Sequence, residues 1–280
     1  MVGRAPLVES TRELLACLAP WLRQISIFDW DGAQGFLPVI RRSLLRRQFD
    51  SLEVAAGLAE SNRGYAAVPL LRPACEELLW LRYFNTLEAG DARILVDCLI
   101  GSGLLDDLEA QVVQVGEGGI AEMGLLPVLA ALRSKGPDIR QKLKELGRRL
   151  GWPRRVVRDG ELPSTWFIAK TNGESSKLYR FLYHATSRYV HFSAIELARR
   201  GWGKPGRLEL SSRTYETIWA EFSLAWGTRL LGWTLQASLD ALLAEGAPEP
   251  DHNALQVAFD RIAEVPLIPL VTLDELQAFR

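Results

Sequence analysis

The sequence predicts an all-α fold: a multi-helix bundle of roughly eight to ten helices with no substantial sheet. Long segments repeat apolar residues every three or four positions, which is the spacing of an amphipathic helix. The β-type runs at 156–157 and 265–271 are short and proline-interrupted. We expect one helical domain over residues 1–245, with a C-terminal helix and tail over 246–280 that packs on it or extends from it.

Composition is that of a soluble globular protein. The chain has 280 residues, 48% hydrophobic and 24% charged, with a net charge of −1. That charge excludes a molecule that binds polyanions over its whole surface, but it allows local patches. Cys17, Cys75 and Cys98 are far apart in apolar helical contexts, so we interpret them as reduced core residues. We expect no metal site and no cofactor.

Two absences bear on location. The first ten residues lack the apolar run of a signal peptide. The most apolar stretches, such as 230–244, contain polar breaks and fall short of the roughly 20 clean residues of a spanning helix. We therefore expect a cytoplasmic protein with no membrane partner.

The first third of the chain predicts three helices. Ser10 and Glu13 form a capping box that opens the first, and Pro20 kinks or ends it. The second runs from about Leu37 to Glu60. The third covers about 65–85, where two prolines mean that it either starts near Leu70 or is kinked. On that third helix Arg72 and Glu76 are four residues apart, so they can pair along one face.

The middle third predicts shorter helices. One runs over about 91–114 and is broken or softened at 101–103, followed by a loop at 116–119. Helices at 120–133 and 139–150 are split by Gly136 and Pro137. A polar loop at 152–161 precedes a short helix that Pro163 and Ser164 open and that ends at Asn172.

The segment Arg133–Arg158 is strongly basic, with ten basic residues against two acidic ones. Its arginines Arg148, Arg149, Arg154 and Arg155 are candidate phosphate-binding residues. The alternative is a solvated helix surface, which is the usual role of a charge run. Trp152 is the segment's one aromatic residue, which gives little support to base stacking.

The stretch Lys177–Ala198 is predicted to be one helix, and it holds two of the three histidines. Its apolar face contains Leu178, Phe181, Leu182, Ala185, Tyr189 and Phe192. Lys177 and Ser187 lie in a polar stripe beside that face, together with four basic side chains that we call the Arg/His stripe: Arg180, His184, Arg188 and His191.

The Arg/His stripe has two interpretations. An arginine one turn away favours the neutral imidazole, and a neutral imidazole beside a fixed cation suits acid/base work on a phosphodiester. The alternative is that the histidines are half-buried, hydrogen-bonded and structural. Arg72, Glu76, Tyr183 and Ser187 are candidate supporting residues in either case.

The chain ends with a loop, a long helix and a tail. The loop covers 199–206, and the long helix runs from about Ser212 to Ala244. A linker at 246–250 separates it from a helix over about 253–264.

Some of these motifs resemble known proteins. Arg72-x-x-x-Glu76, the Pro163-Ser164 entry and Ser187-x-x-x-His191 after Tyr179 together resemble a bacterial family of uncharacterised all-helical proteins. The similarity covers about residues 35–240, and the family has no established activity.

A weaker likeness is to HEPN-type helical domains. These carry an Arg-x4–6-His motif on a late helix and act as dimeric, metal-independent ribonucleases in bacterial defence. Here Arg180 to His184 is Arg-x3-His, and Arg188 to His191 is Arg-x2-His, so the sequence departs from that spacing. The resemblance implies that these residues would polarise a scissile phosphate and assist attack by the 2′-hydroxyl.

Two functions follow as hypotheses. The first is a non-enzymatic helical interaction or regulatory protein of a bacterial stress or defence system; in it His191 stabilises the fold through Ser187, Tyr183 or Glu76. The second is a HEPN-like ribonuclease that uses the Arg/His stripe. A third, small-molecule pocket would be bounded by Tyr183, Glu76 and Trp80. The partner classes consistent with the sequence are RNA, a protein, or a second copy in a homodimer.

Overall fold

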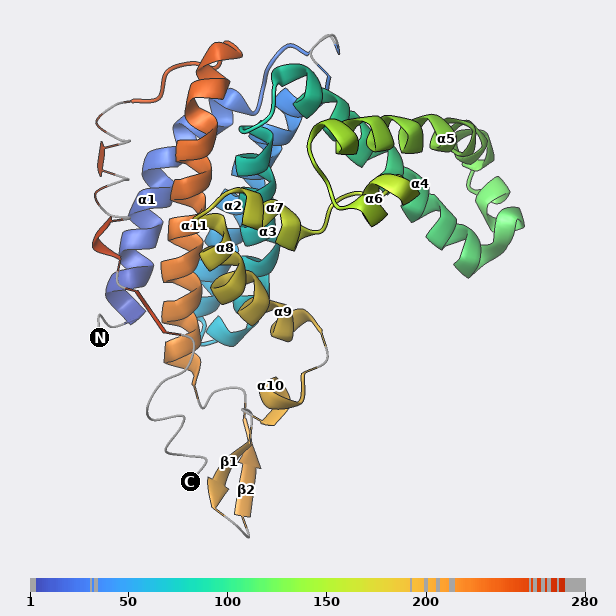
Figure 1. Ribbon diagram of the computed structural model, residues 1–280. Coiled ribbons are helices and arrows are strands. Elements are labelled where there is room, and N and C mark those ends of the chain that lie inside the picture. The colour runs from blue at the N-terminus through green and yellow to red at the C-terminus, as the bar shows by residue number, and fades with distance from the viewer. Residues whose placement is uncertain are drawn as a thin grey trace. The chain divides into compact units, whose positions relative to one another are not determined.

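A computed structural model describes most of the chain. The described residues are 4–30, 32, 35–191, 193–198, 201–204, 207–211, 215–251, 253, 256–257, 260, 263–265 and 267–269. Apart from one short hairpin they form helices joined by turns, which confirms the all-α prediction (Figure 1).

The chain divides into two compact units. Unit 1 comprises residues 1–29, 39–83 and 169–280, and unit 2 comprises residues 30–38 and 84–168. The expectation of one domain over 1–245 stays a prediction.

Most of unit 1 is built on long helices from the two ends of the chain. The shorter elements of its second half follow α7 and lead to a final long helix. The elements are α1 (Arg4–Ile25), α2 (Leu37–Glu60, whose first two residues belong to unit 2), η1 (Gly64–Ala66), η2 (Val68–Leu70), α3 (Leu71–Phe84, whose last residue belongs to unit 2), the end of α7 (Thr165–Thr171, whose first four residues belong to unit 2), α8 (Ser175–Leu178), η3 (Tyr179–Tyr183), α9 (His184–Val190), α10 (Ala194–Ala198), β1 (Gly201–Lys204), β2 (Arg207–Leu210) and α11 (Glu216–Ala244).

Helix α1 begins earlier than the capping box predicts. It starts at Arg4, so Ser10 lies inside it, and it continues past Pro20 to Ile25. A proline inside a helix costs about 3 kcal/mol through its missing hydrogen bond and its ring. The buried apolar stripe of α1 extends on both sides of the proline, from Leu18 to Ile25, and packing of that stripe holds the helix together.

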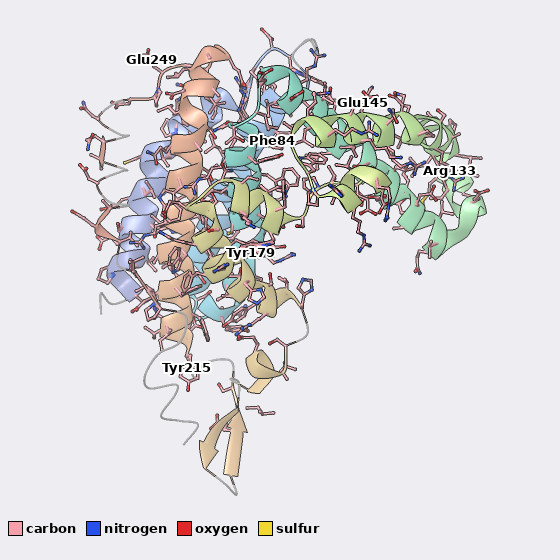
Figure 2. All side chains as sticks on the ribbon, in the orientation of Figure 1. Phe84, Arg133, Glu145, Tyr179, Tyr215 and Glu249 are labelled. Atoms are coloured by element: carbon pink, nitrogen blue, oxygen red, sulfur yellow. The ribbon has the colours of Figure 1, made fainter. Side chains whose placement is uncertain are left out.

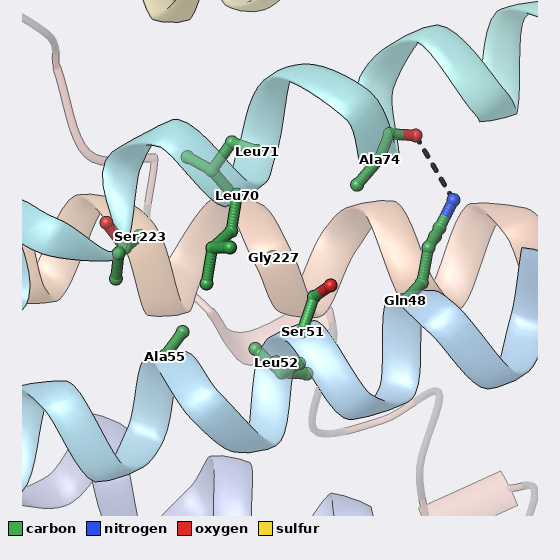
Figure 3. Close-up of a pocket in the computed structure, with 10 residues that line it drawn as sticks. Gln48, Ser51, Leu52, Ala55, Leu70, Leu71, Ala74, Ser223 and Gly227 are labelled. Carbon is green, nitrogen blue, oxygen red and sulfur yellow. Dashed lines mark hydrogen bonds between the residues drawn. The ribbon is translucent and has the colours of Figure 1, made fainter. Parts of the chain in front are cut away.

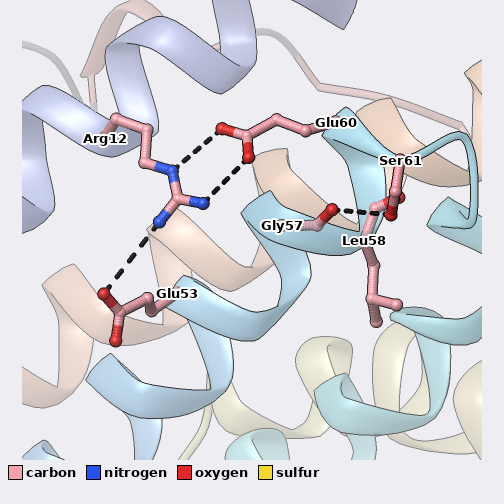
Figure 4. Close-up of polar contacts among 6 residues, drawn as sticks. All are labelled: Arg12, Glu53, Gly57, Leu58, Glu60 and Ser61. Atoms are coloured by element: carbon pink, nitrogen blue, oxygen red, sulfur yellow. Dashed lines mark hydrogen bonds and ion pairs between the residues drawn. The ribbon is translucent and has the colours of Figure 1, made fainter.

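An exposed clamp joins α1 to α2. The guanidinium of Arg12 donates to both carboxylate oxygens of Glu60 at 3.0 Å and lies 4.0 Å from Glu53 (Figure 4). Hydrogen bonding from Arg12 lowers the pKa of Glu60. Because the clamp lies at the surface, solvent screens it and its contribution to stability is small.

The central helix of unit 1 is α11, which is apolar on most sides and largely buried. The chain before α3 approaches it closely at Gly64, where a Cβ atom would lie 2.5 Å from the Ala220 Cα. There the carboxylate of Glu216 accepts hydrogen bonds from the backbone N–H groups of Gly64 and Tyr65. The α-helix that follows starts at Leu71, as the alternative of a start near Leu70 predicts.

A small cavity lies between α2, α3 and α11 (Figure 3). Beside it the side chain of Gln48 donates to the Ala74 carbonyl at 3.1 Å. The cavity measures about 10 Å³, which is room for a single water molecule. It is therefore a gap in the packing of three helices and too small for an organic ligand.

Unit 2 is dominated by an antiparallel pair of long helices (Figure 1). Its helices are α4 (Ala89–Glu122), α5 (Leu126–Arg149) and α6 (Arg154–Asp159). Leu108, Ile120 and Leu129 form a small core between α4 and α5. The polar loop expected at 152–161 contains α6, so that prediction is wrong.

Two predicted helix breaks in unit 2 are wrong. Helix α4 runs through 101–103, and α5 runs through Pro137. A Cβ on Gly101 would lie 2.7 Å from Ile139 Cδ1, and one on Gly136 would lie 3.4 Å from Leu105 Cδ2. These glycines therefore let α4 and α5 pack closely and do not end either helix. The expected loop at 116–119 reduces to one non-helical residue, Gly116, with φ 73°.

The end of the chain differs from its prediction in one element. The segment expected to be a loop over 199–206 contributes β1 to an antiparallel hairpin in which Gly201 pairs with Leu210 and Lys204 with Arg207. Short strands of this kind have too little apolar pattern to be recognised from sequence. Half of the helix expected over 253–264 lies outside the described residues, and the described half is helical.

Candidate functional site

The stretch predicted as one helix over 177–198 is several shorter pieces. A π-helical turn, η3, separates α8 from α9, and α9 ends at Val190. His191 has extended backbone, with φ −112° and ψ 162°. The hydroxyls of Thr186 and Ser187 each donate a hydrogen bond of 2.7 Å to the backbone carbonyl four residues earlier. Bonds of this kind bend helices, which is consistent with the irregular backbone here.

The apolar face of this stretch is confirmed. Leu178, Leu182 and Ala185 are buried. The ring of Phe181 lies 5.0 Å from that of Trp226, and Tyr189 meets Trp219 edge to face at 5.4 Å. Phe192 lies outside the described residues. The residues between α8 and α9 are therefore fixed against α11 by aromatic packing.

Arg72 of α3 ties that helix to the start of α9. Its Nε donates to the Ser187 hydroxyl and its Nη2 to the Tyr183 hydroxyl, both at 3.1 Å. Its guanidinium also lies over the Tyr183 ring, 5.1 Å from the centroid. The two donors sit in the rigid fork of one guanidinium, so they fix the orientation of α9 as well as its distance. The sequence predicted a pairing of Arg72 with Glu76, whereas these bonds run to the later helix.

Glu76 and Tyr179 belong to the same cluster. The Tyr179 ring stacks on that of Tyr183 with centroids 4.7 Å apart, and Figure 2 marks Tyr179 at the start of the π-helical turn. Burial raises the pKa of Tyr179, with further contributions from Tyr183 and Glu76. The structure thus brings together the four predicted supporting residues, and it adds Tyr179, which the sequence analysis did not select.

A second arginine of α3 was also missed. Arg82 donates to the Ser175 hydroxyl at 3.3 Å and lies over the Trp233 ring, 5.8 Å from its centroid. Burial lowers its pKa. The sequence offered one signal for Arg82: it lies between Leu81 and Tyr83 inside an otherwise apolar helix, where a charged side chain needs a partner. Nearby, Cys75 is a free and fully buried thiol whose pKa burial raises, as the interpretation of a reduced core residue predicts.

The Arg/His stripe faces outward. Arg180, His184, Arg188 and His191 are all exposed. The side chains of the last three make no hydrogen bond or ion pair with any described residue. The expectation that His191 stabilises the fold through Ser187, Tyr183 or Glu76 is therefore wrong: its backbone N–H bonds the Ser187 carbonyl at 3.0 Å, but its imidazole lies in solvent.

The four candidate phosphate-binding arginines belong to unit 2, whereas the Arg/His stripe belongs to unit 1. Arg149 pairs with Asp91 at 2.6 Å, and Arg155 lies 3.9 Å from Asp159. Arg133, marked in Figure 2, and Lys142 are likewise paired with carboxylates. Half of the candidate set is thus used within unit 2, while Arg148 and Arg154 are exposed without an ion pair among the described residues.

The described part of the chain holds no group of three or more His, Cys, Asp or Glu side chains arranged to bind a metal ion. None of the described helices is long and apolar enough to cross a membrane. The water-sized cavity of unit 1 is not lined by Tyr183, Glu76 or Trp80, the residues of the predicted small-molecule pocket.

Comparisons with protein-family models, with curated proteins and with solved structures returned no match.

Proposed function

We propose that this chain is a non-enzymatic interaction protein that binds an acidic segment of a partner protein through its Arg/His stripe, as part of a bacterial stress or defence system. One observation carries the binding role. The hydroxyls of Tyr183 and Ser187 accept hydrogen bonds from Arg72 of α3, whereas the exposed side chains of His184, Arg188 and His191 make no hydrogen bond or ion pair with any described residue.

Catalysis has less support than binding. Active sites are concave and hold their reactive groups at fixed positions through further hydrogen bonds. His184, Arg188 and His191 are exposed and their side chains are not oriented by any described residue. His191 also leaves the helix, because its backbone is extended, so it does not continue the helical row on which the nuclease interpretation relied.

The short extent of the stripe favours a short acidic protein segment over RNA. A net charge of −1 gives no long-range attraction for either kind of polyanion, so binding must rest on contacts at the stripe itself. Its two arginines and two imidazoles lie close together along the chain, which matches a short run of carboxylates. Tyr179 and Tyr183 stack on each other and are partly buried, so they do not offer an open ring to a base.

The proposal is tested with a labelled glutamate-rich peptide in a fluorescence-anisotropy titration at low salt. The change is Arg188→Gln, and the matched control is Arg23→Gln, an exposed arginine of α1 in the same unit. We expect the stripe variant to weaken binding about three-fold, the size of one exposed charge pair, and the control to have no effect. Equal effects of the two variants would contradict a specific role for the stripe.

The HEPN-like ribonuclease is the second candidate, favoured by the presence of Arg188 and His184 one turn apart on α9. It predicts metal-independent cleavage of RNA that His184→Ala and His191→Ala each abolish. Tight binding of single-stranded RNA in the same titration, with weak binding of the peptide, would favour this candidate.

A further inference from the structure

Unit 2 contains a cleft that the stripe does not use. It lies between α4, α5 and the residues that follow α6, and its volume is about 240 Å³. We call it the Gly160 cleft, after the residue at which α6 ends and the chain turns across α5. All of its lining residues belong to unit 2.

The path of the chain at Gly160 opens this cleft. Gly160 has φ +68°, a left-handed conformation that glycine adopts without strain. A Cβ there would lie 2.8 Å from the Arg140 carbonyl oxygen, so any side chain would push the segment away from α5. The side chain of Lys144 passes the same point, with its Cε 3.2 Å from that Cβ position.

The cleft has an apolar lining formed by Leu105, Ile139, Leu143 and Leu162. A cavity of about 150 Å³ with such a lining binds benzene in another protein. A cleft of 240 Å³ has room for a somewhat larger molecule, such as one with a phenyl or branched aliphatic group and a short polar end. Burial of such a group would supply most of the binding free energy.

The polar part of the cleft is zwitterionic. Asp106 of α4 and Glu161 after α6 contribute carboxylates, and Arg140 of α5 contributes a guanidinium. All three are exposed, and their side chains form no hydrogen bond or ion pair with the described residues. Carboxylates are the natural partners of an ammonium group, and a guanidinium is the natural partner of a carboxylate.

We propose that the Gly160 cleft binds a free α-amino acid with a large apolar side chain. Asp106 and Glu161 hold its ammonium group, Arg140 holds its carboxylate, and the leucines and Ile139 contact its side chain. The protein would then have a small-molecule site in unit 2 that is independent of the stripe in unit 1.

The test is isothermal titration calorimetry of the full chain with L-phenylalanine, L-leucine and L-tryptophan. We expect at least one to bind at millimolar concentration or below. Phenethylamine lacks the carboxylate and 3-phenylpropionate lacks the ammonium group, so each should bind at least about ten-fold more weakly than L-phenylalanine if that is the ligand bound. The absence of heat with all three amino acids would overturn the proposal.

Variants locate the site. Arg140→Gln and Asp106→Asn should each weaken binding about three-fold, the size of one exposed charge pair, while Arg154→Gln, at an exposed arginine of α6 outside the cleft, should leave it unchanged. Circular dichroism checks that each variant is folded. Binding that both cleft variants leave unchanged, or that the deaminated acid reproduces, would overturn the assignment.

Discussion

The two units of this protein use polar side chains in opposite ways. In unit 1 the guanidinium of Arg72 is partly buried and bonds two hydroxyls on a distant segment, and Glu216 bonds the backbone of a buried turn. In unit 2 the arginines that form ion pairs do so at the surface, as Arg133 does with Glu109. The buried polar contacts of unit 1 therefore stabilise the fold, whereas the surface pairs of unit 2 contribute little to it, and other charged groups of unit 2 are available to a ligand.

The largest effect is expected at Gly64 in unit 1, where the close approach to α11 allows the hydrogen bonds to Glu216. Gly64→Ala places a Cβ against the Ala220 backbone, which cannot move without shifting α11. We expect a loss of about 3 kcal/mol in the free energy of unfolding, measured with urea. The control is Gly57→Ala in α2, where the nearest atom is 3.7 Å away and alanine favours the helix. A Gly64 variant as stable as this control would refute the close approach.

Arg72→Lys should have the next largest effect. Lysine cannot place two donors in the geometry of the guanidinium, so one of the two hydroxyls loses its partner. We expect a loss of about 1–2 kcal/mol. Hydrogen exchange should become faster in α9 and not in α5. Faster exchange in both helices would mean that the residue supports the chain generally and not this one contact.

Glu77 makes the stability of unit 1 depend on pH. Burial raises its pKa, more than its ion pair with Arg47 and its bond from Gln48 lower it. The folded protein therefore keeps the Glu77 carboxyl protonated at pH values where the unfolded chain has lost that proton. The free energy of unfolding falls as pH rises from the unfolded pKa through the raised folded pKa. The unfolded pKa of a glutamate is about 4.3. The melting temperature of Glu77→Gln minus that of the wild type should therefore increase as pH rises from 4 to 7. A constant difference across that range would contradict this.

The smallest effect is expected at Arg133 in unit 2. Its partners, Glu109 and Glu117, lie at the surface like the arginine itself. Solvent and salt screen such pairs, so Arg133→Gln should leave the unfolding midpoint unchanged within error. A clear loss would show that surface pairs hold α4 and α5 together and would remove the contrast between the units.

The sequence predicted these helices from periodicity, and α2 matches its expected bounds of Leu37 and Glu60. It failed where glycine or proline has a tertiary role. Gly101 and Gly136 were interpreted as breaks because a sequence does not show the helix that packs against them. The candidate site was limited in the same way, because residue spacing does not show which helices are neighbours. Spacing placed Ser187 in the polar stripe, but it did not show that the Ser187 hydroxyl accepts a hydrogen bond from Arg72 of another helix.

One part of the site could be predicted and another could not. The 3.6-residue repeat correctly placed Leu182 and Ala185 inside, and it placed His184 in a stripe beside that face without deciding whether it is half-buried; the structure shows it exposed. The π-helical turn and the end of α9 at Val190 depend on hydroxyl-to-carbonyl bonds, which have no periodic signature. His191 was therefore assigned a structural role that its exposed side chain does not have.

The central claim is that the Arg/His stripe is a binding surface and not an active site. Its most direct test is the integrity of single-stranded RNA after long incubation with purified protein and EDTA, for the wild type beside His184→Ala and His191→Ala. All three proteins should leave the RNA intact, and both variants should melt at the wild-type temperature because the two imidazoles are exposed. Cleavage by the wild type that both folded variants lack would contradict the claim and make the stripe a ribonuclease site.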